Sequence, residues 1–222
     1  MEGNPLSTLV LFHIGPVPIS EPVVTTWVIM AVIALVCWLG TRRASVEPNA
    51  LQSAIEIIVE TISDQIGEII QKDTWPYLPL LGTLFLFLVV ANLSAVLPDV
   101  QPPTGHIETP AALAVIVFLS VHYFGIRRRG LGTYLRHYTK PSVLLTPLNV
   151  LSEITRTFSL MIRLFGNMMS HEFVLAIVVF LAGLLVPIPF MVLGVLIGII
   201  QAYIFTVLAA VFIGAAVGSV EA

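Results

Sequence analysis

Long apolar runs are the feature of this chain that most restricts its fold. Residues 23–41, 78–97 and 110–126 are each long enough for an α-helix that crosses the roughly 30 Å hydrocarbon core of a membrane. A helix satisfies its own backbone hydrogen bonds, which lipid cannot do. The chain is 57% hydrophobic and 10% charged, whereas a soluble domain is about 25% charged. We therefore expect an all-α integral membrane protein.

The last two apolar runs are too long for an upright crossing. Residues 147–186 hold no internal proline, and as one helix they would extend about 60 Å, twice the hydrocarbon thickness. This run either breaks near Gly166 or lies strongly tilted. Prolines mark a turn at 187–189, and residues 190–220 form the second long run. We expect residues 147–220 to form a long tilted helical hairpin, which brings the number of crossings to about five.

Residues 48–72 have a different, amphipathic pattern. The apolar residues recur at helical spacing: Leu51, Ile55, Ile58, Ile62, Ile66 and Ile69. The acidic residues recur every four positions on another face: Glu56, Glu60, Asp64 and Glu68. This pattern predicts a helix that lies on the membrane surface or against a partner protein. The acidic face is either solvated or in contact with another subunit.

Basic residues predict the orientation of the chain. With five crossings, eight of the ten Lys and Arg residues fall on one side: Arg42, Arg43, Lys72, Arg127, Arg128, Arg129, Arg136 and Lys140. By the positive-inside rule this side faces the cytoplasm. The chain then forms a single membrane domain over residues 1–222, with the segment 1–22 and the loop 98–109 outside and the C-terminus in the cytoplasm.

Ionisable and polar residues interrupt the run 147–186. At about 100° per residue, the following small and polar positions lie within about 40° of one line: Arg156, Ser159, Arg163, Gly166, Asn167 and Ser170. Glu172 comes nine positions after Arg163 and points to roughly the opposite face, so we expect these two charges to contact different neighbours. Ionisable groups inside a membrane are costly and indicate an ion or substrate path.

The depth of these groups predicts two half-channels separated by a charge. Glu153 lies nearer the cytoplasm, Glu172 and the adjacent His171 lie nearer the exterior, and Arg163 lies between them. Arginine suits the separating role because it stays protonated at any working pH. Glutamate and histidine suit proton exchange because both can titrate when partly buried.

The last apolar run has a face that can pack against the polar side of the run 147–186. Gly194, Gly198, Gln201 and Phe205 share one side of the predicted helix. The glycines allow close helix packing, and Gln201 can form a hydrogen bond with the polar helix.

Three segments resemble subunit a of the rotary F-type ATP synthase. The first is Arg163-Leu-Phe-Gly-Asn167-Met, with Glu172 nine residues after the arginine. The second is Gln201-Ala-Tyr-Ile-Phe-Thr-Val-Leu, and the third is Asn92-Leu-Ser-Ala-Val-Leu-Pro98. The resemblance covers about residues 75–215. It implies an ion-conducting, non-catalytic stator subunit in a bacterial inner membrane, which carries protons or sodium ions.

The resemblance also implies roles for individual residues. Arg163 would face the rotating ring of c subunits and meet its essential carboxylate, and Glu172 would line the outer half-channel. Asn167 and Gln201 would support that interface. Glu153 and Arg156 match polar positions near the inner half-channel, although Arg156 is equally explained as a structural residue that caps a backbone carbonyl or whose charge reaches the membrane surface.

Two further positions leave alternatives open. Asn92 either forms hydrogen bonds between helices or lines the ion path. Several bacterial members of the family have a histidine on the last helix and a glycine directly before the glutamate, whereas this chain has Gly194 and His171 there. This exchange implies that the imidazole reaches the same space from the opposite helix.

The implied partners are the c-subunit ring, the peripheral-stalk b subunits, the rest of the complex and membrane lipid. Nucleic acid, cofactors and metals are not expected. The main rival is a self-contained secondary ion transporter, but the chain has no internal repeat to support it. A haem or metal enzyme is a third class, and the histidines show no convergent ligand spacing. The chain also lacks a phosphate-binding glycine loop, so we expect no nucleotide hydrolysis by it alone.

Overall fold

The structure is a computed structural model that describes residues 10–14, 17–42, 50–71, 73–97, 102–132, 134, 146–183 and 186–218. The described chain is helical apart from one short antiparallel hairpin, β1 Val10–Ile14 and β2 Val17–Ser20. The sequence did not predict this hairpin, which directly precedes the first helix.

Five helices are long and apolar enough to cross a membrane. They are α1 Glu21–Thr41, α3 Leu78–Leu93 with the 3-10 turn η1 Ser94–Val96, α4 Glu108–Arg129, α6 Thr146–Ala182 and α7 Pro187–Val217. The prediction of a helical membrane protein with about five crossings is confirmed.

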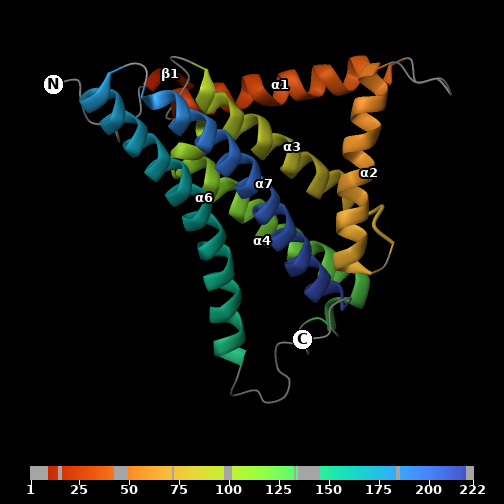
Figure 1. Cartoon of the computed structure of the whole chain (residues 1–222). Helices are drawn as coiled ribbons and strands as arrows, with labels where there is room; N and C mark the ends of the chain where they lie inside the picture. Colours follow the sequence, from red (N-terminus) through yellow and green to blue (C-terminus); the bar gives the residue numbers. More distant parts are fainter. Residues whose placement is uncertain are drawn as a thin grey trace.

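The amphipathic segment forms a separate helix, α2 Ala50–Ile70, which runs crosswise to α1 (Figure 1). Its side chains Ile62, Ile66 and Ile70 are buried, because this face packs on α3 and α7. The acidic side chains on its other face are all exposed: Glu56, Glu60, Asp64 and Glu68. The predicted amphipathic helix is therefore confirmed, and its buried face meets other helices of the same chain.

Helix α6 continues without a break through Gly166 over 37 residues. Its length is about 55 Å at 1.5 Å per residue, so tilt rather than a break fits it into a membrane. Figure 1 shows α6 and α7 running obliquely to α1. The prediction of two long helices in tandem is confirmed, and their tilt in the membrane stays a prediction.

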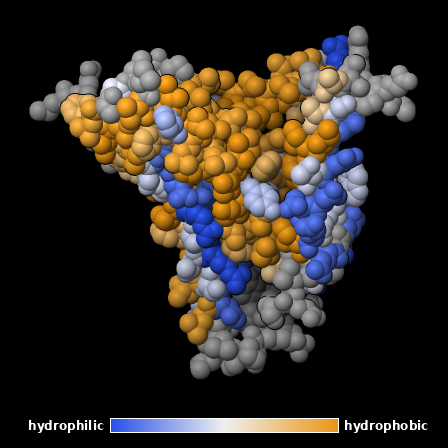
Figure 2. Space-filling view, viewed as in Figure 1, coloured by the Kyte–Doolittle hydropathy of each residue, from blue (hydrophilic) through white to orange (hydrophobic). Residues whose placement is uncertain are grey.

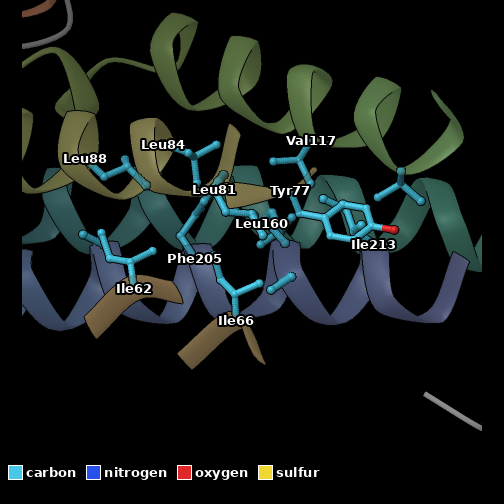
Figure 3. Packing of buried hydrophobic residues seen from close by; sticks show 14 of the residues in the cluster. Ile62, Ile66, Tyr77, Leu81, Leu84, Leu88, Val117, Leu160, Phe205 and Ile213 are labelled. Carbon is cyan, nitrogen blue, oxygen red and sulfur yellow. The ribbon is translucent and has the colours of Figure 1, made fainter. Parts of the chain in front are cut away.

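The core surrounds α7, which contacts α2, α3, α4 and α6. Its Phe205 and Ile213 are fully buried and belong to one apolar cluster with side chains from each of these helices (Figure 3). By contrast, only 6% of the apolar window of α1 is buried in the chain. Since lipid is as apolar as leucine, this packing acts through van der Waals contact rather than through transfer from water.

The basic ends of the helices lie partly within the described residues. Arg129 donates a hydrogen bond from Nη2 to the carbonyl oxygen of Ala215 over 3.3 Å, so the C-terminal ends of α4 and α7 lie together. Arg127 and Arg128 at the same end are exposed. The predicted inner residues Arg43, Lys72, Arg136 and Lys140 lie outside the described residues.

Candidate functional site

A polar stripe runs along the exposed face of α6. Its exposed members are Arg156, Ser159, Arg163, Asn167 and Ser170. Figure 2 shows a hydrophilic stripe between apolar surfaces where α6 borders α7. The stripe faces outward beside a buried flank of α6, about 100° round the helix, which holds three apolar side chains: Leu160, Leu164 and Met168.

An open cavity of about 500 Å³ lies along part of this stripe. Arg156, Ser159 and Arg163 line it from α6, and Leu208 and Phe212 line it from α7. The Arg156 guanidinium carbon lies 5.7 Å from the centre of the Phe212 ring, within the range of a cation–π contact. The two arginines therefore border the same concave surface.

Arg163 has no hydrogen bond or ion pair with any residue that the structure describes. It also lies apart from Glu172, which packs against a different part of the chain. The predicted separation of these two charges is seen in the structure. The guanidinium is thus available to a group from outside the described chain.

One turn beyond Arg163, a hydrogen bond joins the two long helices. The Asn167 amide nitrogen donates to Oε1 of Gln201. Gln201 is only 2% exposed, and its Nε2 has no hydrogen-bond partner among the described residues. The predicted contact between Gln201 and the polar helix is confirmed.

His171 lies against Gly194 of α7. Its ring occupies the place where a Cβ atom at position 194 would stand. Any larger residue there would have to displace the imidazole. This contact agrees with the expectation that the imidazole reaches the last helix from α6.

Glu172 lies under a buried turn, η2 Pro103–Gly105, which precedes α4. Its carboxylate occupies the place where a Cβ atom at Gly105 would stand. Its Oε1 is buried and has no hydrogen-bond partner among the described residues. Sequence reasoning missed Gly105, because a glycine in a proline-rich loop gives no signal of what it contacts.

Asn92 links three elements and is 1% exposed. Its Nδ2 donates to the carbonyl oxygen of Gly198 on α7 over 2.8 Å. Its Oδ1 accepts a hydrogen bond of 2.8 Å from the hydroxyl of Thr104 in η2. The structure therefore shows Asn92 in hydrogen bonds to α7 and η2, and Thr104 is a second residue that sequence reasoning missed.

Glu153 and Arg156 point to different neighbours. Glu153 Oε1 lies 3.9 Å from Nε2 of His122 on α4, and Nδ1 of His122 lies 2.8 Å from the carbonyl oxygen of Phe118. Arg156 lies on the α7 side, against Phe212. The structure thus divides this predicted pair between two sides of α6.

Among the described residues, no three His, Cys, Asp or Glu side chains gather as they would around a metal ion. The polar groups instead form two regions of α6. The first is the open surface with Arg163, and the second is the buried contact of Glu172 with η2. Such an arrangement can hold a fixed positive charge apart from a carboxylate that can accept a proton.

Comparison with known proteins identifies the family of this chain. Residues 23–214 match the family model described as ATP synthase A chain. The chain is 64% identical over 220 residues to an ATP synthase subunit a 2 of Bradyrhizobium, with 99% of each chain covered. It is 46% identical to an ATP synthase subunit a 2 of Pelobacter propionicus, with 97% of this chain and 95% of that protein covered. The chain therefore belongs to the ATP synthase A chain family.

Proposed function

We propose that this chain is the static ion-conducting subunit of a rotary ATP synthase. Two offset half-channels pass protons or sodium ions to and from the carboxylate of a rotating c-subunit ring, and Arg163 separates them. The subunit is non-catalytic and acts as part of the complex. One observation carries the proposal: Arg163 is exposed on a membrane helix and lacks a partner among the described residues.

The physical cost of that arginine supports a partner outside the chain. A charged side chain at the centre of a membrane helix costs about 2.5–3.5 kcal/mol on insertion scales. A carboxylate about 4 Å away would attract it by about 4 kcal/mol at an effective dielectric constant of 20. Desolvation cancels part of this attraction, so the contact can form and break as the ring turns.

Glu172 is the proposed group of the outer half-channel. Glu172 is half-buried as a residue, and its buried Oε1 lacks a hydrogen-bond partner among the described residues, so no described group competes for a proton at this oxygen. His171 lies beside it in sequence, and Asn167 and Gln201 join α6 to α7 next to Arg163. These contacts would keep the ring-facing surface in a fixed shape.

The inner half-channel is proposed to follow the open cavity between α6 and α7. Arg156 and Ser159 line this cavity together with Arg163. Glu153 lies on the neighbouring side of α6, toward His122. The position of Arg156 on the cavity wall favours a role in the path over a purely structural one.

The remaining assignments concern membrane and partners. We propose a bacterial inner membrane, with the N-terminus outside, the C-terminus in the cytoplasm and residues 1–222 in one membrane domain. The exposed acidic face of α2 is the proposed contact for the peripheral-stalk b subunits. A secondary transporter is less well supported, since such proteins bind substrate at interrupted helices and α6 and α7 are continuous.

The decisive experiment replaces Arg163 in the assembled complex. Arg163→Ala should abolish ATP-driven gradient formation in inverted vesicles, while passive leak through the membrane sector stays or rises. Arg163→Lys should also be severely impaired, because lysine carries a more localised and more strongly hydrated charge. Arg127→Ala, at the exposed end of α4, is the matched control. Normal pumping with alanine at position 163 would refute the mechanism and favour the transporter.

A further inference from the structure

The connection between α3 and α4 enters the interior of the helix bundle. Its residues Pro102 to Gly105 are all buried, and η2 contacts α1, α3, α4 and α6. Connecting segments usually run over the surface, because buried backbone polar groups need partners. A buried turn at this place therefore needs a structural explanation.

Thr104 anchors the turn. Its side chain is 0% exposed, and its hydroxyl donates a hydrogen bond of 2.8 Å to Oδ1 of Asn92. Asn92 in turn donates to the carbonyl oxygen of Gly198 over 2.8 Å. These two hydrogen bonds connect the turn to α3 and α7. The side chains of Thr104 and Asn92 are buried, so water would not replace a lost hydrogen bond there.

Gly105 forms the contact with Glu172. All three atoms of the Glu172 carboxyl group lie within 3.0 Å of the place where a Cβ at position 105 would stand. A real Cβ atom does not approach other atoms so closely, so alanine at this position would displace the carboxylate or the turn. The glycine is therefore required by the position of Glu172, and not by its own backbone conformation.

From these contacts we propose that η2 is a positioning element for the Glu172 carboxylate. Thr104 holds the turn in place through Asn92, and Gly105 leaves the space that the carboxylate occupies. This inference rests on the proposed role of Glu172 in the outer half-channel. It adds Thr104 and Gly105 as positioning residues for ion transfer.

The first test uses Gly105→Ala in the full ATP synthase complex. ATP-driven gradient formation should fall at least about tenfold at equal assembly, since a displacement of about 1 Å at a reacting group can cost that much or more. Gly82→Ala is the control, because nothing lies within 4 Å of a Cβ at that membrane glycine. Glu172→Asp, with its shorter side chain, should partly restore pumping when combined with Gly105→Ala.

A second pair of variants tests the anchor and decides the matter if Gly105→Ala fails to assemble. Thr104→Val removes the hydroxyl at similar volume and should lower pumping, whereas Thr104→Ser keeps the donor and should retain most of it. Equal pumping by the valine and serine variants would overturn the inference. So would a double variant of Gly105→Ala and Glu172→Asp whose loss of pumping equals the product of the two single losses. If Glu172→Gln itself pumps normally, the proposed role of Glu172 fails instead.

Discussion

At the scale of single residues, two glycines matter because they leave space for polar side chains. Gly194 makes room for the His171 ring, and this contact helps α6 and α7 to lie close together. Gly105 makes room for the Glu172 carboxylate in the same way. Both glycines belong to elements other than α6, and each lies where a polar side chain from α6 packs closely against it.

The contact of Gly194 with His171 leads to a prediction. Gly194→Ala should lower ATP-driven gradient formation, because the new methyl group would displace the imidazole from the interface. Combining Gly194→Ala with His171→Ala should restore part of the loss, since the smaller side chain leaves space for the methyl group. Pumping in vesicles measures both effects. A double variant that pumps worse than Gly194→Ala alone would show that the steric contact is not the cause.

Glu172 gives the second prediction at this scale. Glu172→Gln keeps the shape of the side chain and removes its titratable group. Proton-driven ATP synthesis should fall strongly while the complex still assembles, because proton exchange needs a group that can change its charge. Synthesis is measured across pH 6–9. Wild-type rates throughout that range would show that the outer path does not need this carboxylate.

At the scale of elements, α2 and α6 bury and expose different kinds of face. Helix α6 keeps Leu160, Leu164 and Met168 inward, which leaves its polar stripe facing outward over its length. Helix α2 buries one apolar face against the bundle and exposes its acidic face. The hydroxyl of Tyr203 on α7 donates to Oε1 of Gln65 over 2.7 Å, which adds a polar link at the rim of this contact.

The packing of α2 predicts an effect on stability. Ile66 is 2% exposed, so Ile66→Ala should leave a cavity and lower the stability of the α2 contact by about 2 kcal/mol or more. Ile57→Ala, at a position that is 62% exposed, should have little effect. The thermal midpoint of the purified complex in detergent measures the difference. Equal midpoints for the two variants would mean that α2 is not held by this face.

At the scale of the whole molecule, the five apolar helices establish a multi-pass membrane protein, and the family match establishes its class. The prediction of an ion-transporting, multi-pass subunit in ATP synthesis is confirmed at this level. Its sidedness stays a prediction. The described basic residues at the ends of α1 and α4 are Arg42, Arg127, Arg128 and Arg129, and the positive-inside rule places these ends in the cytoplasm.

Thiol labelling checks the sidedness. In a Cys37→Ser background, Ile107→Cys should react with a membrane-impermeant reagent from outside the cell, because it precedes α4. Leu131→Cys, just after the basic end of α4, should react only in inverted vesicles. Both positions are exposed in the chain, so burial does not explain a failure to react. Labelling from the opposite sides would reverse the proposed orientation.

Much of the fold and part of the site followed from the sequence alone. Apolar run length predicted the five crossings, and the 3.6-residue period predicted which side of α2 is buried and which residues of α6 share a stripe. The same argument predicted that Arg163 and Glu172 lie on different faces of the helix, because they are nine positions apart. These properties depend on neighbours within one helix, where backbone geometry alone sets the arrangement.

Tertiary structure alone decided which elements meet those faces. Glu153 points to His122 on α4 rather than sharing a cavity with Arg156. Glu172 meets Gly105, and Asn92 meets Thr104 and Gly198. Helical periodicity gives the direction of a side chain but not the helix or turn that packs opposite it. That choice depends on how tilted helices and a buried loop fit together, which is a property of the whole assembled bundle.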